Sequence, residues 1–587
     1  MAVFLRNRAS RSQTVHRILA LGLFVASLLP GQSTSASING RITDPSKALI
    51  AGAKVAVTGA ATNARFQAMT DASGQYFLTN LPPGAYRIEI QKAGFKKLVK
   101  PDVILHVQDA LDIDFEMTLG AASETVTVEG GAPLVNTESG AVSTLVDRRL
   151  VENLPLNGRS FQTLIALTPG VVVTATAFDD QGQFSVNGQR ADANYFTVDG
   201  VSANFGVNGY FPMVQTASGS LPALSPGGGT NSLVSVDAMQ EFRIQTSSFA
   251  PEFGRTPGAQ ISIVTRSGTN AFHGTLFEYF RNNVLDARDW FTNYNGLPKP
   301  GERQNDFGGV LGGPVVRNRT FFFFSYEGQR LRQPATQQTV VPDAASRQQA
   351  LAAMQPYLNA FPVANGPAAG PGAAQFNASY SNPSNLDATA IRVDHVLGAR
   401  LTLFGRYNYS PSNLVLRGPL TGVGDVLSQT TSEFSSVHTG TLGLTESITP
   451  RISNEVRANY SNQSIRLTYR LDTFGGAVPL SDAALFPPGI SSATGVFGFY
   501  IPGVGDYNQG KSGMNEQRQV NFIDNLSVTK AGHQWKFGVD YRWLAPFNSP
   551  YSYRQFVQFT GMSAAPGGAL SGTVAAAATY AAQTDAL

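Results

Sequence analysis

The chain has 587 residues, of which 42% are hydrophobic, 10% are aromatic and only 14% are charged, whereas soluble globular domains carry about 25% charged residues. The hydrophobic content excludes wholesale disorder, and a net charge of +3 with no block of like charges argues against nucleic-acid binding. With 0 cysteines, the sequence also excludes a disulfide scaffold, a cysteine-based zinc finger and a cysteine nucleophile.

The first segment has the pattern of a secretory signal peptide. Basic residues precede the apolar run 18–29, which Pro30-Gly31 and a group of small residues follow. This order predicts a signal peptide at 1–36 with cleavage near Ala36. A membrane anchor is the alternative, but the apolar run is too short to cross about 30 Å of hydrocarbon as a helix. We therefore expect an exported protein.

Residues 37–120 predict a small β-sandwich. Short β-branched runs alternate there with turns rich in Gly, Pro and Asp. The segments 40–44, 74–76 and 81–86 resemble the carboxypeptidase-regulatory-like domain, a transthyretin-like sandwich often grouped with carbohydrate-binding folds. The segment supplies no His/Glu zinc set, so no peptidase is implied. We expect a spacer or docking module, with glycan binding as the alternative.

A linker at 121–134 carries a short alternating segment between glycines. Its residues are Glu124, Thr125, Val126, Thr127, Val128 and Glu129. Such a strand suits addition to the exposed sheet edge of a partner, and it resembles the TonB box of TonB-dependent outer-membrane receptors. The resemblance implies a TonB-type energy-coupling protein as partner. An edge strand of the preceding sandwich is the alternative.

Residues 135–270 contain an ordered series of short motifs that resembles the plug of Oar-like TonB-dependent receptors. The motif residues that we single out are Asn157, Gly158, Arg159, Asn187, Gly188, Arg190, Asp199 and Gly200. Taken alone, Asp199-Gly200 is simply a turn. Under the resemblance, the loops 171–183 and 202–232 are the part of the plug that contacts an external ligand.

From 271 to 587 the sequence predicts strands of about ten residues in which apolar and polar positions alternate, as in 534–543. Short turns are predicted at Arg317-Asn318, Gly398-Ala399, Thr449-Pro450 and Ala531-Gly532. Long loops are predicted near 283–305, 331–387, 411–435 and 466–515. Short turns on one side and long loops on the other are typical of a transmembrane antiparallel β-barrel rather than a soluble sandwich. Basic residues predicted to face the barrel interior, such as Arg392 and Lys536, could bind anionic groups of a ligand. The alternative is that they are there only because a barrel lumen is polar in any case.

The predicted strands are too few to close the barrel that the resemblance implies. His273–Asn282 and the four hairpins give nine strands, and Tyr551–Gly561 is a candidate tenth, whereas 22-stranded barrels of outer-membrane transporters hold a plug. The segment 575–587 has no amphipathic strand ending in an aromatic residue. We therefore expect an incomplete barrel, in a sequence that is either a fragment of a longer chain or a truncated reading frame.

One catalytic motif matches by letter only. Residues 505–512 fit the phosphate-binding pattern GxxxxGKS, but the predicted loop around them lacks the flanking strand and helix that phosphate binding needs. The six histidines have no metal-ligand spacing. We expect no enzyme, no cofactor and no metal.

Together these patterns predict an all-β protein of the outer membrane: a sandwich, a plug and an incomplete barrel. The resemblance implies a TonB-dependent receptor that takes up an external ligand, such as an oligosaccharide, a peptide or a chelate, and that contacts outer-membrane lipid. The alternative is a structural or adhesive outer-membrane protein without energised transport.

Overall fold

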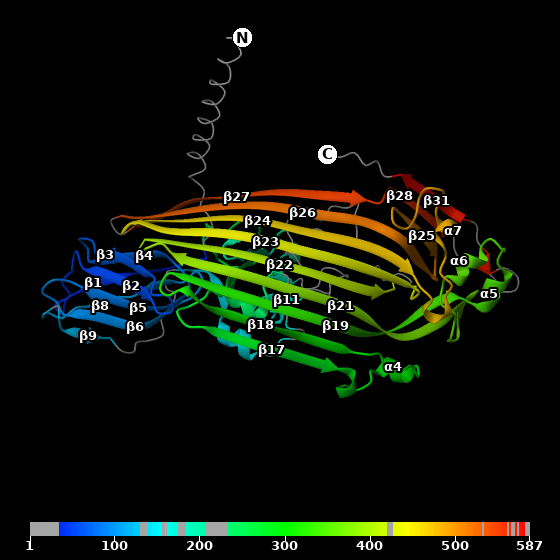
Figure 1. The fold of residues 1–587 in the computed structure, drawn as a ribbon, viewed down its shortest axis with the longest axis horizontal. Coiled ribbons are helices and arrows are strands. Elements are labelled where there is room, and N and C mark those ends of the chain that lie inside the picture. Colours follow the sequence, from blue (N-terminus) through cyan, green and yellow to red (C-terminus); the bar gives the residue numbers. More distant parts are fainter. Residues whose placement is uncertain are drawn as a thin grey trace, which may run out of the picture.

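The computed structural model describes residues 34–121, 123–128, 139–154, 156, 159, 161–173, 184–206, 233–398, 400–418, 426–530, 533–559, 563–564, 570–571 and 574–581. They form three bodies in chain order, namely a sandwich, a plug and a long curved sheet (Figure 1). The all-β fold class is confirmed. The predicted signal peptide lies outside the described residues up to residue 33, and Ala36 already belongs to the first strand. In the part of the chain that the structure describes, no helix is long and apolar enough to cross a membrane.

The sandwich consists of two sheets that share one apolar core. The first sheet contains β1 (Ala36–Thr43), β4 (Gln75–Leu81), β7 (Ala110–Asp112) and β8 (Phe115–Glu116). The second has the order β3 (Arg65–Met69), β2 (Lys54–Gly59), β5 (Gly84–Gln91), β6 (Lys97–Leu105) and β9 (Thr125–Thr127). Alternate residues point inward, so Ile38, Val55 and Ile88 are fully buried. Each such side chain stabilises the sandwich by about 1.5–3 kcal/mol.

The plug is built on a mixed sheet of five strands. Their order is β10 (Val142–Val146), β15 (Met239–Ser247), β16 (Gln260–Thr265), β13 (Tyr195–Val198) and β14 (Val201–Ser202). Around it lie the hairpin of β11 (Val171–Val173) and β12 (Phe184–Val186), the helices α2 (Arg148–Asn153) and α3 (Gln162–Ile165), and the 3-10 helices η3 (Ala191–Ala193) and η5 (Val236–Ala238). Phe161, Phe242 and Ile263 are fully buried in one plug core. Most of the two predicted ligand loops, residues 174–183 and 207–232, lies outside the described residues.

Within the described residues, nine long strands form the wall, each antiparallel to the next. They are β17 (His273–Asn282), β18 (Arg303–Val316), β19 (Thr320–Pro342), β21 (Ala373–Val396), β22 (Leu401–Arg417), β23 (Gln429–Thr449), β24 (Ile452–Leu471), β26 (Gly505–Lys530) and β27 (His533–Pro550). Their number equals the predicted one. The turns predicted at 317–318 and 449–450 are present, whereas Ala399, Ala531 and Gly532 lie outside the described residues.

The predicted alternation places polar residues inside and apolar residues outside. On β24, Glu455 and Arg457 are buried on the inner face, whereas Tyr460 is 48% exposed. On β27, Trp535 and Trp543 are 48% and 49% exposed on the outer face. This is the pattern of a strand that has lipid on one side and a polar lumen on the other.

The loop predicted near 283–305 is present between β17 and β18, but the other wall strands are longer than predicted and the loops predicted near 331–387, 411–435 and 466–515 are correspondingly shorter. The wall strands run on into the segments expected to be loops, and β26 has 26 residues, about 86 Å at 3.3 Å per residue. Only about ten residues of each strand are needed to cross a membrane. Beyond the bilayer neither face has to be apolar, so the alternation that identifies a strand fades while the backbone pairing continues. Residues 505–512, with the phosphate-binding letters, begin β26, and the strand continues after them.

The strand ends and their connections form a cap with an apolar core at this long-loop end. The cap contains η6 (Asn283–Leu285), α4 (Trp290–Tyr294), α5 (Ala344–Gln349), α6 (Gln355–Asn359), β20 (Ala368–Gly370), η7 (Phe474–Gly476), α7 (Asp482–Leu485) and β25 (Gly495–Ile501). Phe361, Phe499 and Tyr507 are fully buried in its core. The chain then adds β28 (Tyr553–Phe559), β29 (Ser563–Ala564), β30 (Leu570–Ser571) and β31 (Val574–Ala581). The candidate tenth strand is β28, which pairs with β25 and β31 rather than with β27.

Candidate functional site: the seat of the plug

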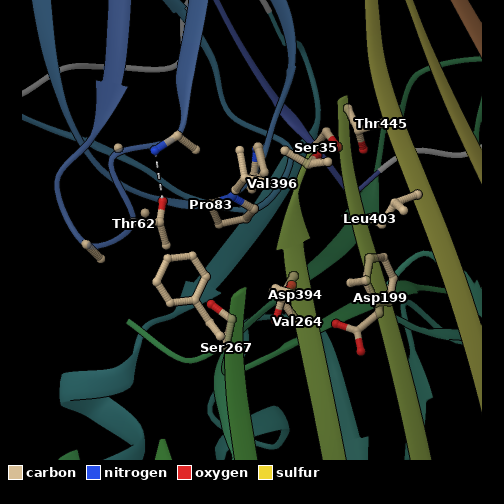
Figure 2. A pocket seen from close by; sticks show the side chains of 18 of the residues that line it. Ser35, Thr62, Pro83, Asp199, Val264, Ser267, Asp394, Val396, Leu403 and Thr445 are labelled. Atoms are coloured by element: carbon tan, nitrogen blue, oxygen red, sulfur yellow. Dashed lines mark hydrogen bonds between the residues drawn. The ribbon is translucent and has the colours of Figure 1, made fainter. Parts of the chain in front are cut away.

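The plug, the wall and the sandwich meet at the short-turn end of the wall (Figure 1). A cavity of about 190 Å³ lies at the junction. Figure 2 shows that its lining comes from all three bodies, with Thr62 and Pro83 from the sandwich, Val264 from the plug, and Asp394 and Leu403 from the wall. The junction is therefore a joint between the bodies, and its polar contacts decide how firmly the plug is held.

Asp199-Gly200 forms the tight turn that its sequence suggests. The two residues join β13 to β14, with φ angles of 50° and 84°. Positive φ at both central residues is the type I′ hairpin that Asp-Gly favours. Gly200 has a second constraint, because a Cβ added there would lie 2.7 Å from the Nε atom of Arg457 on the wall. The turn is thus also a point of close contact between plug and wall.

Two buried plug residues, Asp199 and Arg159, form ion pairs with wall residues, and we call these two contacts the seats of the plug. The Asp199 carboxylate makes the first seat. It accepts hydrogen bonds from the backbone N–H of Thr265 at 2.9 Å and from its hydroxyl at 2.8 Å, both within the plug. From the wall, Arg392 of β21 donates to it at 3.2 Å, and the Nε atom of Arg406 of β22 lies 3.9 Å away. Burial raises the pKa of Asp199, but the two guanidinium groups and the Thr265 hydrogen bonds outweigh it and lower the pKa below its ordinary value. The carboxylate therefore stays charged in its seat.

Arg159 makes the second seat. Its buried guanidinium pairs with Asp237 of η5 and lies 3.5 Å from Glu327 of β19 and 3.6 Å from Asp306 of β18. It also lies over the rings of Phe277 and Tyr279 of β17, with centroid distances of 4.4 and 4.5 Å. Burial lowers the pKa of Arg159, but the surrounding acids raise it by more. Asn157 and Gly158 of the same motif lie outside the described residues.

The Asn187-Gly188 motif stays within the plug. Both residues have positive φ, 50° and 76°, in the turn after β12. The Asn187 amide donates to the carbonyl oxygen of Thr246 on β15 at 3.0 Å, which fixes the hairpin to the plug sheet. Arg190 lies exposed just before η3. These residues shape the plug and do not join the two seats.

The interior bases of the wall face the plug. Besides Arg392, Lys536 of β27 lies 2.9 Å from Glu252 of the plug, and Arg542 donates to the Ser202 hydroxyl at 2.9 Å. Arg457 pairs with its strand neighbour Glu455. In the described structure these arginine and lysine side chains are therefore paired with groups of the plug or the wall. The sequence had suggested that they could bind anionic ligands.

The sandwich is fixed to the plug through β15. Its loop at 106–109 meets Glu241, which lies 2.7 Å from the Nδ1 atom of His106 and accepts from the backbone N–H of Val107 at 2.5 Å. Asp109 lies 2.5 Å from Arg243. The hydrogen bond to Glu241 raises the pKa of His106 more than burial lowers it. The sandwich is thus a docked body with a buried polar interface.

The candidate TonB box lies on the sandwich. Residues 125–127 form β9, which pairs in parallel with β6, and Glu124 forms a salt bridge of 2.6 Å with Lys96. Val128 packs against the sandwich core, and Glu129 lies outside the described residues. The segment therefore takes the place of a sandwich edge strand, the alternative that the sequence left open.

The sequence did not reveal which residues pair with Asp199 and Arg159, or which plug residues hold the sandwich. The missed residues are Glu241, Arg243, Asp306, Glu327 and Arg406. The usable signal was a charged residue at an inward position of an alternating strand, as at Asp306 and Glu327. The partner of each charge depends on contacts between residues far apart in the chain, which the pattern does not reveal.

Comparison with known families identifies the class of protein. Residues 264–353 and 348–584 match the outer membrane beta barrel domain, and residues 37–118 match the carboxypeptidase regulatory-like domain. The first match covers more than half of the chain, so the chain belongs to the outer membrane β-barrel family and its place is the outer membrane. Long loops of such barrels are extracellular and short turns periplasmic, so the cap is extracellular and the sandwich periplasmic.

The chain is also similar to particular proteins. It is 30% identical over 337 residues to the TonB-dependent transporter Oar of Myxococcus xanthus, a match that covers 54% of this chain and 29% of the relative. The expected resemblance to Oar-like proteins is thus confirmed, although the chain spans less than a third of that relative's length.

Two solved structures are also similar. The outer membrane transporter YddB from Escherichia coli has a TM-score of 0.47 and 11% identity, over 71% of this chain and 50% of its own. The siderophore receptor PirA from Acinetobacter baumannii has a TM-score of 0.42 and 12% identity, over 69% of this chain and 48% of its own.

Proposed function

We propose that this chain acts as a TonB-dependent receptor that takes up an external ligand across the outer membrane. The observation that carries the proposal is a plug, built on a sheet of its own, that is seated on the polar inner face of a β-barrel wall. Its two seats, at Asp199 and Arg159, are ion pairs between plug and wall. A purely structural barrel has no need of a domain held in this way. The proposal assigns no catalytic residue.

The plug has a mechanical route to the periplasm. From β9 the chain leads through residues 129–141 to β10, the first strand in the order of the plug sheet, which pairs with β15. Tension from the periplasm would reach the plug sheet at this strand. Removing one partner of a buried ion pair leaves the other charge uncompensated at a cost of about 3–5 kcal/mol, and a pull from the periplasm supplies the energy to separate the pairs that hold the plug.

The function is tested with three separate pools of labelled oligosaccharides, peptides and ferric chelates. Cells carrying the full chain are compared with cells whose chain lacks residues 124–129. We expect one pool to enter in the wild type only, and its entry to stop when the proton gradient is dissipated. Surface binding of a glycan that the deletion leaves unchanged, with no entry of any pool, would instead indicate the adhesive function.

A further inference from the structure

An acidic side chain of β26 lies on the outer, lipid-facing side of the wall. Asp524 is directly opposite Val456 of β24 and Val539 of β27, and residues opposite each other in a sheet share a face. Phe522 and Leu526, two positions away along β26, share this face as well, and Phe522 is 38% exposed on it. Asp524 therefore points outward among apolar side chains.

Two tryptophans mark the depth of Asp524 in the membrane. Trp535 and Trp543 of β27 are both half-exposed on the outer face, and tryptophan is enriched where a barrel meets the two edges of the hydrocarbon. The strand rises about 26 Å from one to the other at 3.3 Å per residue, which at a tilt of about 40° spans about 20 Å of membrane thickness. Val539 is four residues from each tryptophan, so Asp524 beside it lies near the middle of the lipid-facing band.

This polar position is not satisfied by the wall itself. Within the described residues, the Oδ1 atom of Asp524 is enclosed and has no hydrogen-bond partner, and the same is true of the side-chain oxygen of Asn454 on β24. Asn454 is opposite Leu526, which makes it a diagonal neighbour of Asp524 on the same face. Polar groups without partners are costly in hydrocarbon, and ionisable residues inside a membrane usually pair. Asp524 is only half-buried as a whole, so its carboxyl group can turn toward a neighbour in the membrane.

We propose that a second copy of this chain packs against this face of the wall, with the Asp524 carboxyl groups of the two copies hydrogen-bonded to each other. Two copies with the same orientation in the membrane are related by a two-fold axis along the membrane normal, which places each residue opposite its own copy at the same depth. A carboxyl group that carries its proton is both a donor and an acceptor, so two of them form a reciprocal pair. The Asn454 carboxamide is also both donor and acceptor. Both groups are thus complementary to themselves, and a second copy satisfies them.

The surface beside Asp524 lets a second copy approach closely. Ala458 is exposed there and lies directly opposite Leu442 of β23 and Phe522 of β26. Small residues let two transmembrane surfaces come into contact. β26 lies between β24 and β27 (Figure 1), so three described strands form the contact face.

The test is chemical cross-linking of the full chain in outer membranes, since the chain has 0 native cysteines. Val456→Cys places a thiol beside Asp524, and a short bis-maleimide should link it into a product of twice the chain mass. Ile391→Cys on β21 is the matched control, because Ile391 is 46% exposed on the same outer face and five residues from the periplasmic end of its strand. We expect this control to stay monomeric.

The role of the carboxyl group is tested in the Val456→Cys background. Asp524→Leu removes the polar group and should lower the association constant of the dimer about tenfold, measured as the cross-linked fraction at increasing expression levels. Asp524→Asn keeps a donor and an acceptor and should leave the association constant unchanged.

Four results would overturn the proposal. A cross-linked product of another mass would show that a different protein covers this face, and no product would show that lipid alone surrounds it. Equal cross-linking at Val456 and Ile391 would indicate random encounters in the membrane. An unchanged association constant in Asp524→Leu would show that the dimer does not use this group. Should Asp524→Leu fail to fold, the comparison between Val456 and Ile391 still decides whether this face meets a second copy.

Discussion

At the residue scale, the plug depends on single buried charges whose partners belong to another body. Asp199 is the clearest case, because its carboxylate faces the wall arginines Arg392 and Arg406. Asp199→Asn keeps the shape and the hydrogen bond from the Thr265 N–H but removes the charge and one of the two acceptor oxygens. We expect the unseating of the plug to become easier by about 3 kcal/mol, measured as protease cleavage of the plug during urea titration in micelles. Asp286→Asn, an exposed acid in the cap, is the control and should change stability by less than about 0.5 kcal/mol.

His106 makes the docking of the sandwich depend on pH. Glu241 raises the pKa of His106 in the docked state, where Asp109 and Arg243 also face it. The stabilisation is therefore fully present below the unfolded pKa of about 6.5 and is lost as the pH rises through the higher docked value. We expect the protection factors of the amides at residues 106–109, which are the intrinsic exchange rates at each pH divided by the observed rates, to fall over that window. His106→Gln should abolish this pH dependence, and a pH profile that persists in the variant would mean that another group titrates.

At the scale of elements, the two positive-φ glycines of the plug motifs form a matched pair. Gly200 and Gly188 have φ angles of 84° and 76°, but only at Gly200 does a Cβ meet a neighbour, Arg457 at 2.7 Å. Each Gly→Ala change adds backbone strain of about 1–2 kcal/mol. Gly200→Ala should cost more, because Arg457 must also move. The difference between the urea midpoints of unfolding of the two variants measures the cost of the contact between the new Cβ atom and Arg457. Equal midpoints would show that the Arg457 guanidinium moves aside freely.

The alternation of the wall strands gives a second prediction at this scale. Leu442 of β23 is 66% exposed on the outer face, seven residues before Thr449 at the periplasmic end. Leu442→Arg should reduce folding stability in liposomes by about 2–4 kcal/mol, the cost of arginine near the bilayer midplane. The same change at Val363, which is 52% exposed in the cap, should cost less than about 0.5 kcal/mol. Similar costs at the two sites would place Leu442 outside the lipid.

The elements also show where sequence reasoning succeeds. Alternation and turn residues are local signals, so the nine wall strands and the Asp199-Gly200 hairpin could be predicted. Strand length could not, because β19 and β26 continue beyond the lipid, where no apolar face is required. The pairing partner of β9 could not be predicted either. The sequence Thr-Val-Thr can pair equally well with β6 or with another protein, and only the three-dimensional structure shows that β6 lies beside it.

At the scale of the whole molecule, the sandwich touches both the plug and the wall, so its motion can be tested separately from its folding. Thr79 of the sandwich and Ser453 of β24 have hydroxyl oxygens 2.5 Å apart, and the chain contains 0 cysteines. The double variant Thr79→Cys/Ser453→Cys should therefore form a disulfide between sandwich and wall when oxidised. If the TonB-type partner pulls through the sandwich, the oxidised form should bind the purified periplasmic domain of that partner but lose ligand uptake, and reduction should restore it. Uptake that continues in the oxidised form would mean that tension reaches the plug through residues 129–141 while the sandwich stays in place.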